Sequence, residues 1–144
     1  MRALARNPRE LALTLRILAV AGLVPALMRL RLGRLEAVLE PRRARRDLDE
    51  EAAERLARRV DDVLAAGRPF LRSGCLTRGV TLYYFLRRAG ADVELVFGMG
   101  KPDDGFAGHC WLVKAGEPYL EGTDPRPLFT PMHTIPRPAR ASGS

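Results

Sequence analysis

The sequence has few cysteine, histidine and aromatic residues: 144 residues include 2 Cys, 2 His, 1 Trp and 6% aromatics. Two cysteines, Cys75 and Cys110, are too few for a disulfide scaffold and lack CxxC spacing, although a bridge between them would abolish a free thiol. A reducing, cytoplasmic environment is therefore expected. At this length one hydrophobic core is sufficient for folding, so no stabilising metal or cofactor is required.

Acidic residues are scarce in the first third of the chain. Residues 1–46 hold 11 Arg against three Glu, a net charge of +8, whereas residues 47–144 hold 13 basic and 14 acidic residues, a net charge of −1. The basic third also contains no aromatic residue that would stack on nucleic-acid bases. This pattern disfavours nucleic acid and favours an acidic partner or a membrane surface, as for a cytoplasmic protein peripheral to the inner membrane face.

The sequence also lacks a long uninterrupted hydrophobic run. Residues 11–28 are mostly apolar, but Arg16 interrupts them and Pro25 weakens a continuous helix. The remaining stretch, residues 17–28, is shorter than the roughly 18 to 20 residues of a membrane span, and no clear signal-peptide cleavage site follows. We expect a helix that the core or a partner covers, with peripheral membrane contact as the alternative.

Before residue 90 the apolar residues recur at helical spacing. The predicted helices are residues 11–30, 32–39, 48–64 and 75–89. Asp47, with Glu50 three residues later, predicts the cap of the third helix, and Gly67 predicts its end. Ser73 and Gly74 lead into the fourth helix.

After residue 90 the hydrophobic period changes from helix to strand. Three extended segments are predicted, at residues 93–99, 109–114 and 119–121, with a tight hairpin turn at residues 115–117. A turn-rich loop, residues 101–108, joins the first two. The chain is rich in proline from residue 125 onward, and its tail is expected to be disordered. Helices followed by an antiparallel sheet make an α+β fold.

A cysteine at the start of a predicted helix is a candidate nucleophile. Cys75 occupies such a position, where the positive helix end and unpaired backbone amides favour a thiolate and an oxyanion. His109 follows on a predicted strand, on the same face as Trp111, where an imidazole can exchange protons with sulfur. Glu121 and Asp124 are the two candidates for the acid that orients the imidazole.

Each of these residues also has an ordinary structural explanation, since buried cysteines often act as small hydrophobes and buried histidines as polar core groups. A zinc site is a weaker alternative that would use four ligands, Cys75, His109, Cys110 and His133. Adjacent strand residues point to opposite faces, so His109 and Cys110 would not converge on one ion. No metal is therefore expected.

Three motifs together resemble a known family. These motifs are CLTRG at residues 75–79, LRRAGADVELVFGMG at residues 86–100 and GHCWLV at residues 108–113. They are similar to the transglutaminase-like cysteine peptidases of lasso-peptide biosynthesis, which remove the leader from a ribosomally made precursor peptide. The likeness is strong over residues 74–121 and extends at fold level over residues 11–136.

The resemblance implies an order of regions along the chain. A helical N-terminal region, residues 1–70, would precede a papain- or transglutaminase-like core, residues 71–136, and a disordered tail, residues 137–144, all within one compact domain. In that core the nucleophile helix packs on a small antiparallel sheet.

The resemblance also implies residue roles. Cys75 would be the nucleophile, His109 the general base and acid, and Trp111 a neighbour of the site. Arg78 matches the Cys-Leu-x-Arg pattern and would bind substrate or hold the helix in place, and Phe106 would be an apolar substrate contact in the loop beside the site.

The orienting acid aligns better with Glu121 than with Asp124, while a Cys-His dyad is the alternative. Two departures stand out: Gly79 replaces a usual small hydroxyl residue, and Cys110 replaces a usual alanine.

The function implied is a thiol peptidase that cleaves its precursor through a thioester without a cofactor. The partners implied are the precursor peptide, a leader-recognition protein and an ATP-dependent ring-closing enzyme, with the Arg-rich helices as docking surface or membrane contact. Two alternatives remain: another transglutaminase-like amidase or acyl transferase, and a non-catalytic scaffold that binds a partner.

Overall fold

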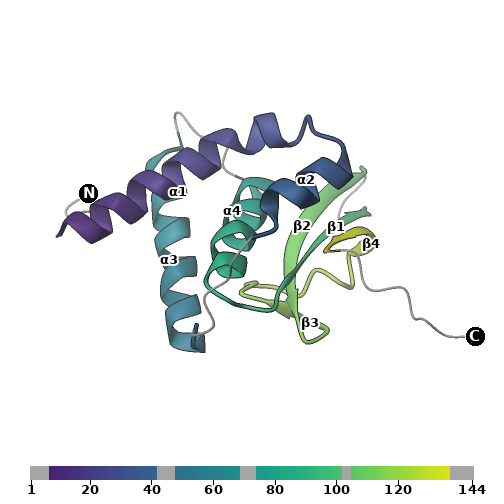
Figure 1. Cartoon of the computed structure of the whole chain (residues 1–144). Coiled ribbons are helices and arrows are strands. Elements are labelled where there is room, and N and C mark those ends of the chain that lie inside the picture. The colour runs from purple at the N-terminus through teal and green to yellow at the C-terminus, as the bar shows by residue number, and fades with distance from the viewer. Residues whose placement is uncertain (1–6, 42–47, 69–73, 102–104, 137–144) are drawn as a thin grey trace, which may run out of the picture.

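The computed structural model describes residues 7–41, 48–68, 74–101 and 105–136. In this part of the chain, four helices precede a four-stranded antiparallel sheet of order β3-β2-β1-β4, which confirms the predicted α+β fold (Figure 1). The helices are α1 (Pro8–Leu27), α2 (Leu32–Leu39), α3 (Glu50–Ala66) and α4 (Cys75–Arg88). The strands are β1 (Glu94–Gly100), β2 (Ala107–Lys114), β3 (Glu117–Tyr119) and β4 (Phe129–Ile135).

Side-chain caps fix the starts of α1 and α3. The Asn7 side chain accepts hydrogen bonds from the amides of Arg9 and Glu10, at 2.9 and 3.0 Å. For α3 the cap is Asp49, whose side chain accepts a hydrogen bond of 2.6 Å from the Ala52 amide. The predicted cap at Asp47, which lies outside the described residues, is therefore wrong by two positions: Asp49 places its carboxylate three residues before a free amide.

The hydrophobic core is continuous from the helices to the sheet. Buried residues of α1, α3 and α4 join Leu95 and Leu112 of the sheet in a single cluster. Helix α4 lies at the centre, in contact with α1 and α3 on one side and with β2 on the other (Figure 1). Full burial of one leucine side chain contributes about 1.5–3 kcal/mol, so the N-terminal helices support the sheet energetically.

Helix α1 is long and apolar enough to cross a membrane, judged by length and composition. A core helix of a soluble protein meets the same criterion, and the buried face of α1 carries Ile17, Ala21 and Val24 against the neighbouring helices. Pro25 lies in the last turn and does not interrupt the helix, because its missing amide removes only one late hydrogen bond. The prediction of a covered helix is thus confirmed for the face buried in the core, and coverage of the other face by a partner stays a prediction.

Strand β4 is absent from the sequence prediction, which shows only a proline-rich segment after residue 125. It pairs with β1, with Leu95 opposite Ile135 and Phe97 opposite His133. The strand tolerates Pro131 because β4 is an edge strand and the register shifts between Phe97 and Gly98, next to the proline. The predicted strand count was therefore wrong by one.

The hairpin between β2 and β3 has the predicted turn. Ala115 and Gly116 have φ values of 52° and 81°, which are typical of a two-residue hairpin turn that matches strand twist. Strand β3 ends earlier than predicted, at Tyr119, because Leu120 adopts a left-handed conformation with φ of 57°. The chain beyond Leu120 leaves the regular sheet, which frees the Glu121 side chain to turn inward.

The two residues that depart from the resembled motif touch each other. A Cβ atom at Gly79 on α4 would lie 2.9 Å from the Sγ atom of Cys110 on β2 and 3.3 Å from Leu95. Carbon and sulfur cannot approach so closely without a shift, so the Cys110 side chain occupies the space that a residue at position 79 would need. The glycine and the cysteine therefore compensate for each other in the contact between α4 and the sheet.

This contact predicts a coupled pair of substitutions. Gly79→Ser should lower the free energy of unfolding by about 1–3 kcal/mol through overpacking. Cys110→Ala should lower it by about 1 kcal/mol through a small cavity. The double variant should lose less unfolding free energy than the two single variants lose together, because alanine at position 110 makes room for serine at position 79. Urea denaturation of all four proteins measures the coupling, and additive losses would contradict the compensation.

Candidate active site

Cys75 and His109 line the same pocket, which has a volume of about 260 Å³. Cys75 is the first residue of α4, and His109 is the third residue of β2. The rest of the wall is mostly apolar and comes from Leu76, Phe97, Gly98, Met99, Gly108 and Cys110. The fold thus brings together the predicted nucleophile and the predicted base, which are 34 residues apart in sequence.

Cys75 combines a partly exposed thiol with a helix start. Gly74 is the N-cap of α4 and has no side chain to cap the helix, and its carbonyl accepts the amide of Arg78 at 3.0 Å. The amides of the first turn have no acceptor within the helix and point toward its N-terminus. Such amides stabilise an anion, so this end of α4 can hold the oxyanion that forms when sulfur attacks a carbonyl.

Two aromatic rings hold the His109 imidazole. Its ring centroid lies 4.8 Å from that of Phe129 and 5.8 Å from that of Trp111, with interplanar angles of 24° and 22°. Burial lowers the pKa of His109 below its usual value, because the charged imidazolium loses hydration. The imidazole is therefore neutral at pH 7 and able to accept a proton. The sequence did not indicate Phe129, since β4 was not predicted.

Gly98 makes room for Trp111. A Cβ atom at this position would lie 2.7 Å from two carbon atoms of the Trp111 ring and 2.9 Å from the carbonyl oxygen of Thr130. Gly98 pairs directly with His109 across β1 and β2. The absence of a side chain at Gly98 lets the buried indole lie beside the imidazole, as the sequence predicted for Trp111.

Glu121 turns toward β2 and α4. Its Oε1 atom accepts a hydrogen bond of 3.3 Å from the Leu112 amide and lies 3.7 Å from an Arg78 guanidinium nitrogen. Burial raises the pKa of Glu121, while the Leu112 amide and the Arg78 charge oppose that rise. The carboxylate thus lies against β2 at Leu112, which is three residues after His109 on that strand.

Arg78 links three parts of the chain through hydrogen bonds and ion pairs. Its Nε atom donates a hydrogen bond of 2.6 Å to Asp61 on α3, and another guanidinium nitrogen donates one of 2.8 Å to the Leu120 carbonyl oxygen. With Glu121, these partners link α3, α4 and the chain after β3. Arg78 is not among the residues that line the Cys75 pocket. Its contacts favour the role of holding the helix over direct binding of substrate.

Asp124 and Phe106 lie apart from the pocket. The Asp124 carboxylate is exposed and accepts hydrogen bonds from the Arg126 amide at 2.9 Å and from its guanidinium at 2.8 Å. The Phe106 side chain is 76% exposed, and the Lys101 ammonium lies 4.4 Å from its ring centroid. Within the described ranges, neither Glu121 nor Asp124 makes a hydrogen bond to His109.

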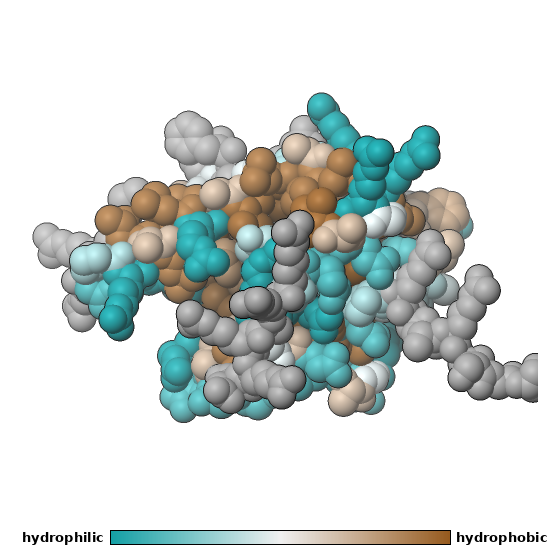
Figure 2. Space-filling model, viewed as in Figure 1, coloured by the Kyte–Doolittle hydropathy of each residue, from teal (hydrophilic) through white to brown (hydrophobic). Residues whose placement is uncertain are grey.

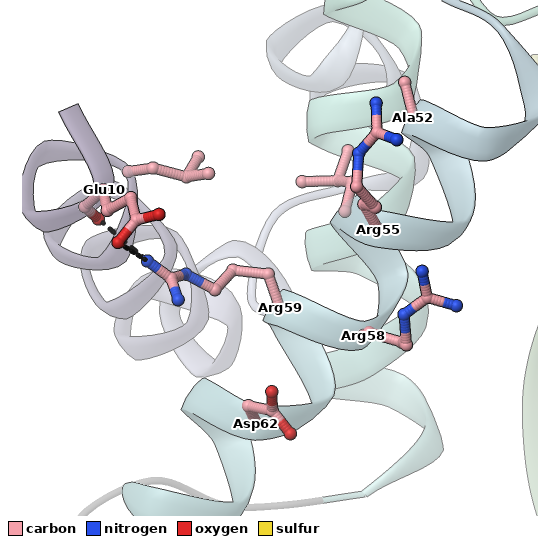
Figure 3. A pocket seen from close by; sticks show the side chains of 8 residues that line it. Glu10, Ala52, Arg55, Arg58, Arg59 and Asp62 are labelled. Carbon is pink, nitrogen blue, oxygen red and sulfur yellow. Dashed lines mark hydrogen bonds and ion pairs between the residues drawn. The ribbon is translucent and has the colours of Figure 1, made fainter. Parts of the chain in front are cut away.

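A larger groove, of about 480 Å³, runs between α1 and α3 (Figure 3). Arg59 crosses it and lies 3.8 Å from the Glu10 carboxylate. The groove is lined by several arginines but by no cysteine or histidine, so it lacks a nucleophile and a base. Over the described residues, no group of three or more His, Cys, Asp or Glu side chains could hold a metal ion. Of these two cavities, the Cys75 pocket is therefore the better candidate for an active site.

Comparison with known proteins gives a family for the chain. No curated protein and no solved structure matches the chain. The family described as the transglutaminase-like superfamily matches residues 17–134, a range that begins halfway along α1 and reaches the last residues of β4. This superfamily typically contains cysteine peptidases that use Cys, His and Asp. A match over that range, with a cysteine at a helix start and a histidine in its pocket, shows that the chain belongs to the transglutaminase-like superfamily.

Proposed function

We propose that the protein is a cysteine peptidase that removes the leader segment from a ribosomally made, lasso-type precursor peptide. The observation that carries this proposal is the shared pocket of Cys75 and His109 at the N-terminus of α4. The superfamily supports a thiol enzyme of the peptidase or acyl transferase type. The resemblance of the three motifs to leader-removing enzymes supports the finer substrate class.

The proposed reaction is acyl transfer to water. His109 accepts the Cys75 proton, and the sulfur attacks the carbonyl carbon of the bond between leader and core. The amides at the start of α4 hold the oxyanion. The C–N bond breaks as the departing amine takes the proton from His109, which leaves a thioester. Water then attacks the thioester, with His109 again accepting a proton, and the Cys75 thiol is regenerated as the acid product leaves.

For the acid that assists His109, Glu121 is favoured over Asp124. Glu121 is largely shielded from solvent and its carboxylate accepts a hydrogen bond from β2, the strand that carries His109, whereas Asp124 is already paired with Arg126 in solvent. Hydrogen bonds of catalytic groups are often long or incomplete before substrate binds. If Glu121 turns from the Leu112 amide to the imidazole, it completes a Cys-His-Glu triad, and without that movement the enzyme works as a dyad.

The same proposal includes two partner proteins, a leader-recognition protein and an ATP-dependent ring-closing enzyme. The Cys75 pocket, at about 260 Å³, has room for little more than the residues next to the cleaved bond. A separate protein that binds the leader would supply the contacts that this small pocket does not make. The rest of the precursor would then be held outside this pocket.

The first prediction concerns the reactivity of the two thiols. We expect iodoacetamide to modify Cys75 at neutral pH about tenfold faster than Cys110, because Cys75 is partly exposed and shares its pocket with the His109 imidazole, whereas Cys110 is buried. His109→Ala should remove most of that advantage. Peptide mass spectrometry between about pH 6 and 9 measures both rates in the same sample.

Cys110 is the internal control for this measurement. Burial raises the pKa of the Cys110 thiol, so it should stay protonated and slow throughout this pH range. Equal rates for the two cysteines, or a Cys75 rate that His109→Ala leaves unchanged, would contradict an activated nucleophile.

The second prediction concerns cleavage of a lasso-type precursor in the presence of its leader-recognition protein. Cys75→Ala should abolish cleavage, and Glu121→Gln should lower kcat by about 10²-fold or more if its carboxylate orients His109. The matched change Asp124→Asn should alter kcat by less than about twofold, since Asp124 lies on the surface with Arg126.

Mass spectrometry of the released leader and core measures these rates. Equal effects of Glu121→Gln and Asp124→Asn would contradict the assignment of Glu121. Incorporation of a labelled amine instead of hydrolysis would identify an acyl transferase and would contradict the peptidase proposal.

A further inference from the structure

Helix α1 is apolar on two opposite faces. One face is buried against α3 and α4, and at 100° per residue the opposite face consists of small and branched apolar residues that are exposed. We call this face the outer strip: Leu11, Leu15, Ala19, Gly22, Leu23 and Ala26. Figure 2 shows it as a brown band along α1 that continues toward α2, where Leu32 and Val38 are also exposed.

The outer strip is long and strongly exposed. Its leucines Leu11, Leu15 and Leu23 retain 46%, 56% and 57% of their accessible surface. From residue 11 to residue 26 the strip extends about 22 Å along the helix axis. Soluble monomers rarely leave a continuous apolar band of this kind uncovered, so the strip marks an interaction surface.

Arginines border the strip. Arg9 and Arg16 lie along one side of it on the helix, and Arg29, Arg31 and Arg34 follow its C-terminal end, all of them exposed. Arg16 rests over the Phe85 ring at 5.5 Å. Among the described residues, the remaining arginines of this border have no carboxylate partner; they are Arg9, Arg29, Arg31 and Arg34. Their charges are thus available to an anionic surface, while their aliphatic stems extend the apolar band.

We propose that the outer strip docks on the surface of an anionic phospholipid bilayer, with α1 parallel to the membrane plane. A leucine-rich face beside arginines is the pattern of an interfacial helix. Hot spots of protein interfaces are enriched in Trp and Tyr, and residues 1–46 contain neither. The arginines beside the strip complement an anionic surface, which together with this absence favours lipid over a protein partner. Because its other face is buried against α3 and α4, α1 lies on the membrane and does not cross it.

Vesicle flotation tests this proposal with the full-length protein. Binding is expected to phosphatidylcholine vesicles that contain about 30% phosphatidylglycerol, and much less to pure phosphatidylcholine. Salt at about 0.5 M should weaken binding by screening the arginines. This comparison uses the unaltered protein, so it does not depend on how any variant folds.

Variants then locate the surface. The pair Leu15→Glu and Leu23→Glu, made together, should reduce the bound fraction about tenfold or more. Met132→Glu, at a residue 69% exposed on β4, is the matched control and should leave binding unchanged. Arg34→Glu should weaken binding, whereas Arg55→Glu, on α3 and paired there with Glu51, should not.

Three outcomes would overturn the proposal. The first is no preference for anionic vesicles at low salt, and the second is binding that the Leu15 and Leu23 substitutions do not change. The third is a dimer that those substitutions dissociate, because a second copy of the chain would then cover the strip. The rate of Cys75 alkylation reports whether each variant is folded. The proposal is independent of the peptidase function: vesicle binding should persist in Cys75→Ala.

Discussion

The contact between α4 and the sheet is the constraint on which the rest of the structure depends. It places the first residue of α4, Cys75, beside His109 of β2 in one pocket. Within this contact, the Cys110 sulfur fills the space of the side chain that Gly79 lacks. Any residue that separates α4 from β2 would also separate Cys75 from His109, so the packing of this contact determines whether the two side chains share a pocket.

Arg78 extends this constraint to the other elements. Positioned one turn after Cys75, it fastens α4 to Asp61 on α3 and to the chain that carries Glu121. A guanidinium suits this task because its fixed fork of donors can serve a carboxylate and a carbonyl oxygen at once. The candidate acid, Glu121, is therefore held by the same residue that fixes the nucleophile helix, and its separation from His109 is a property of this network.

Local signals in the sequence were enough to predict the helices, the β2–β3 hairpin and a cysteine at a helix start, because caps, periodicity and turn residues act over a few neighbours. Strand β4 escaped prediction because prolines hide it and only its pairing with β1 makes it a strand. Phe129, which stacks on His109, was missed for the same reason. The Glu121 contacts depend on the left-handed Leu120, which periodicity does not reveal.

The apolar wall of the pocket shapes the chemistry that Cys75 and His109 can perform. Phe97, Met99 and Leu76 contribute apolar surface to the pocket, and burial lowers the pKa of His109. A neutral imidazole is a competent proton acceptor, and the weak screening in such an environment strengthens the attraction between the α4 amides and a developing oxyanion. The apolar surroundings therefore supply the base in its reactive form and increase the effect of the helix start.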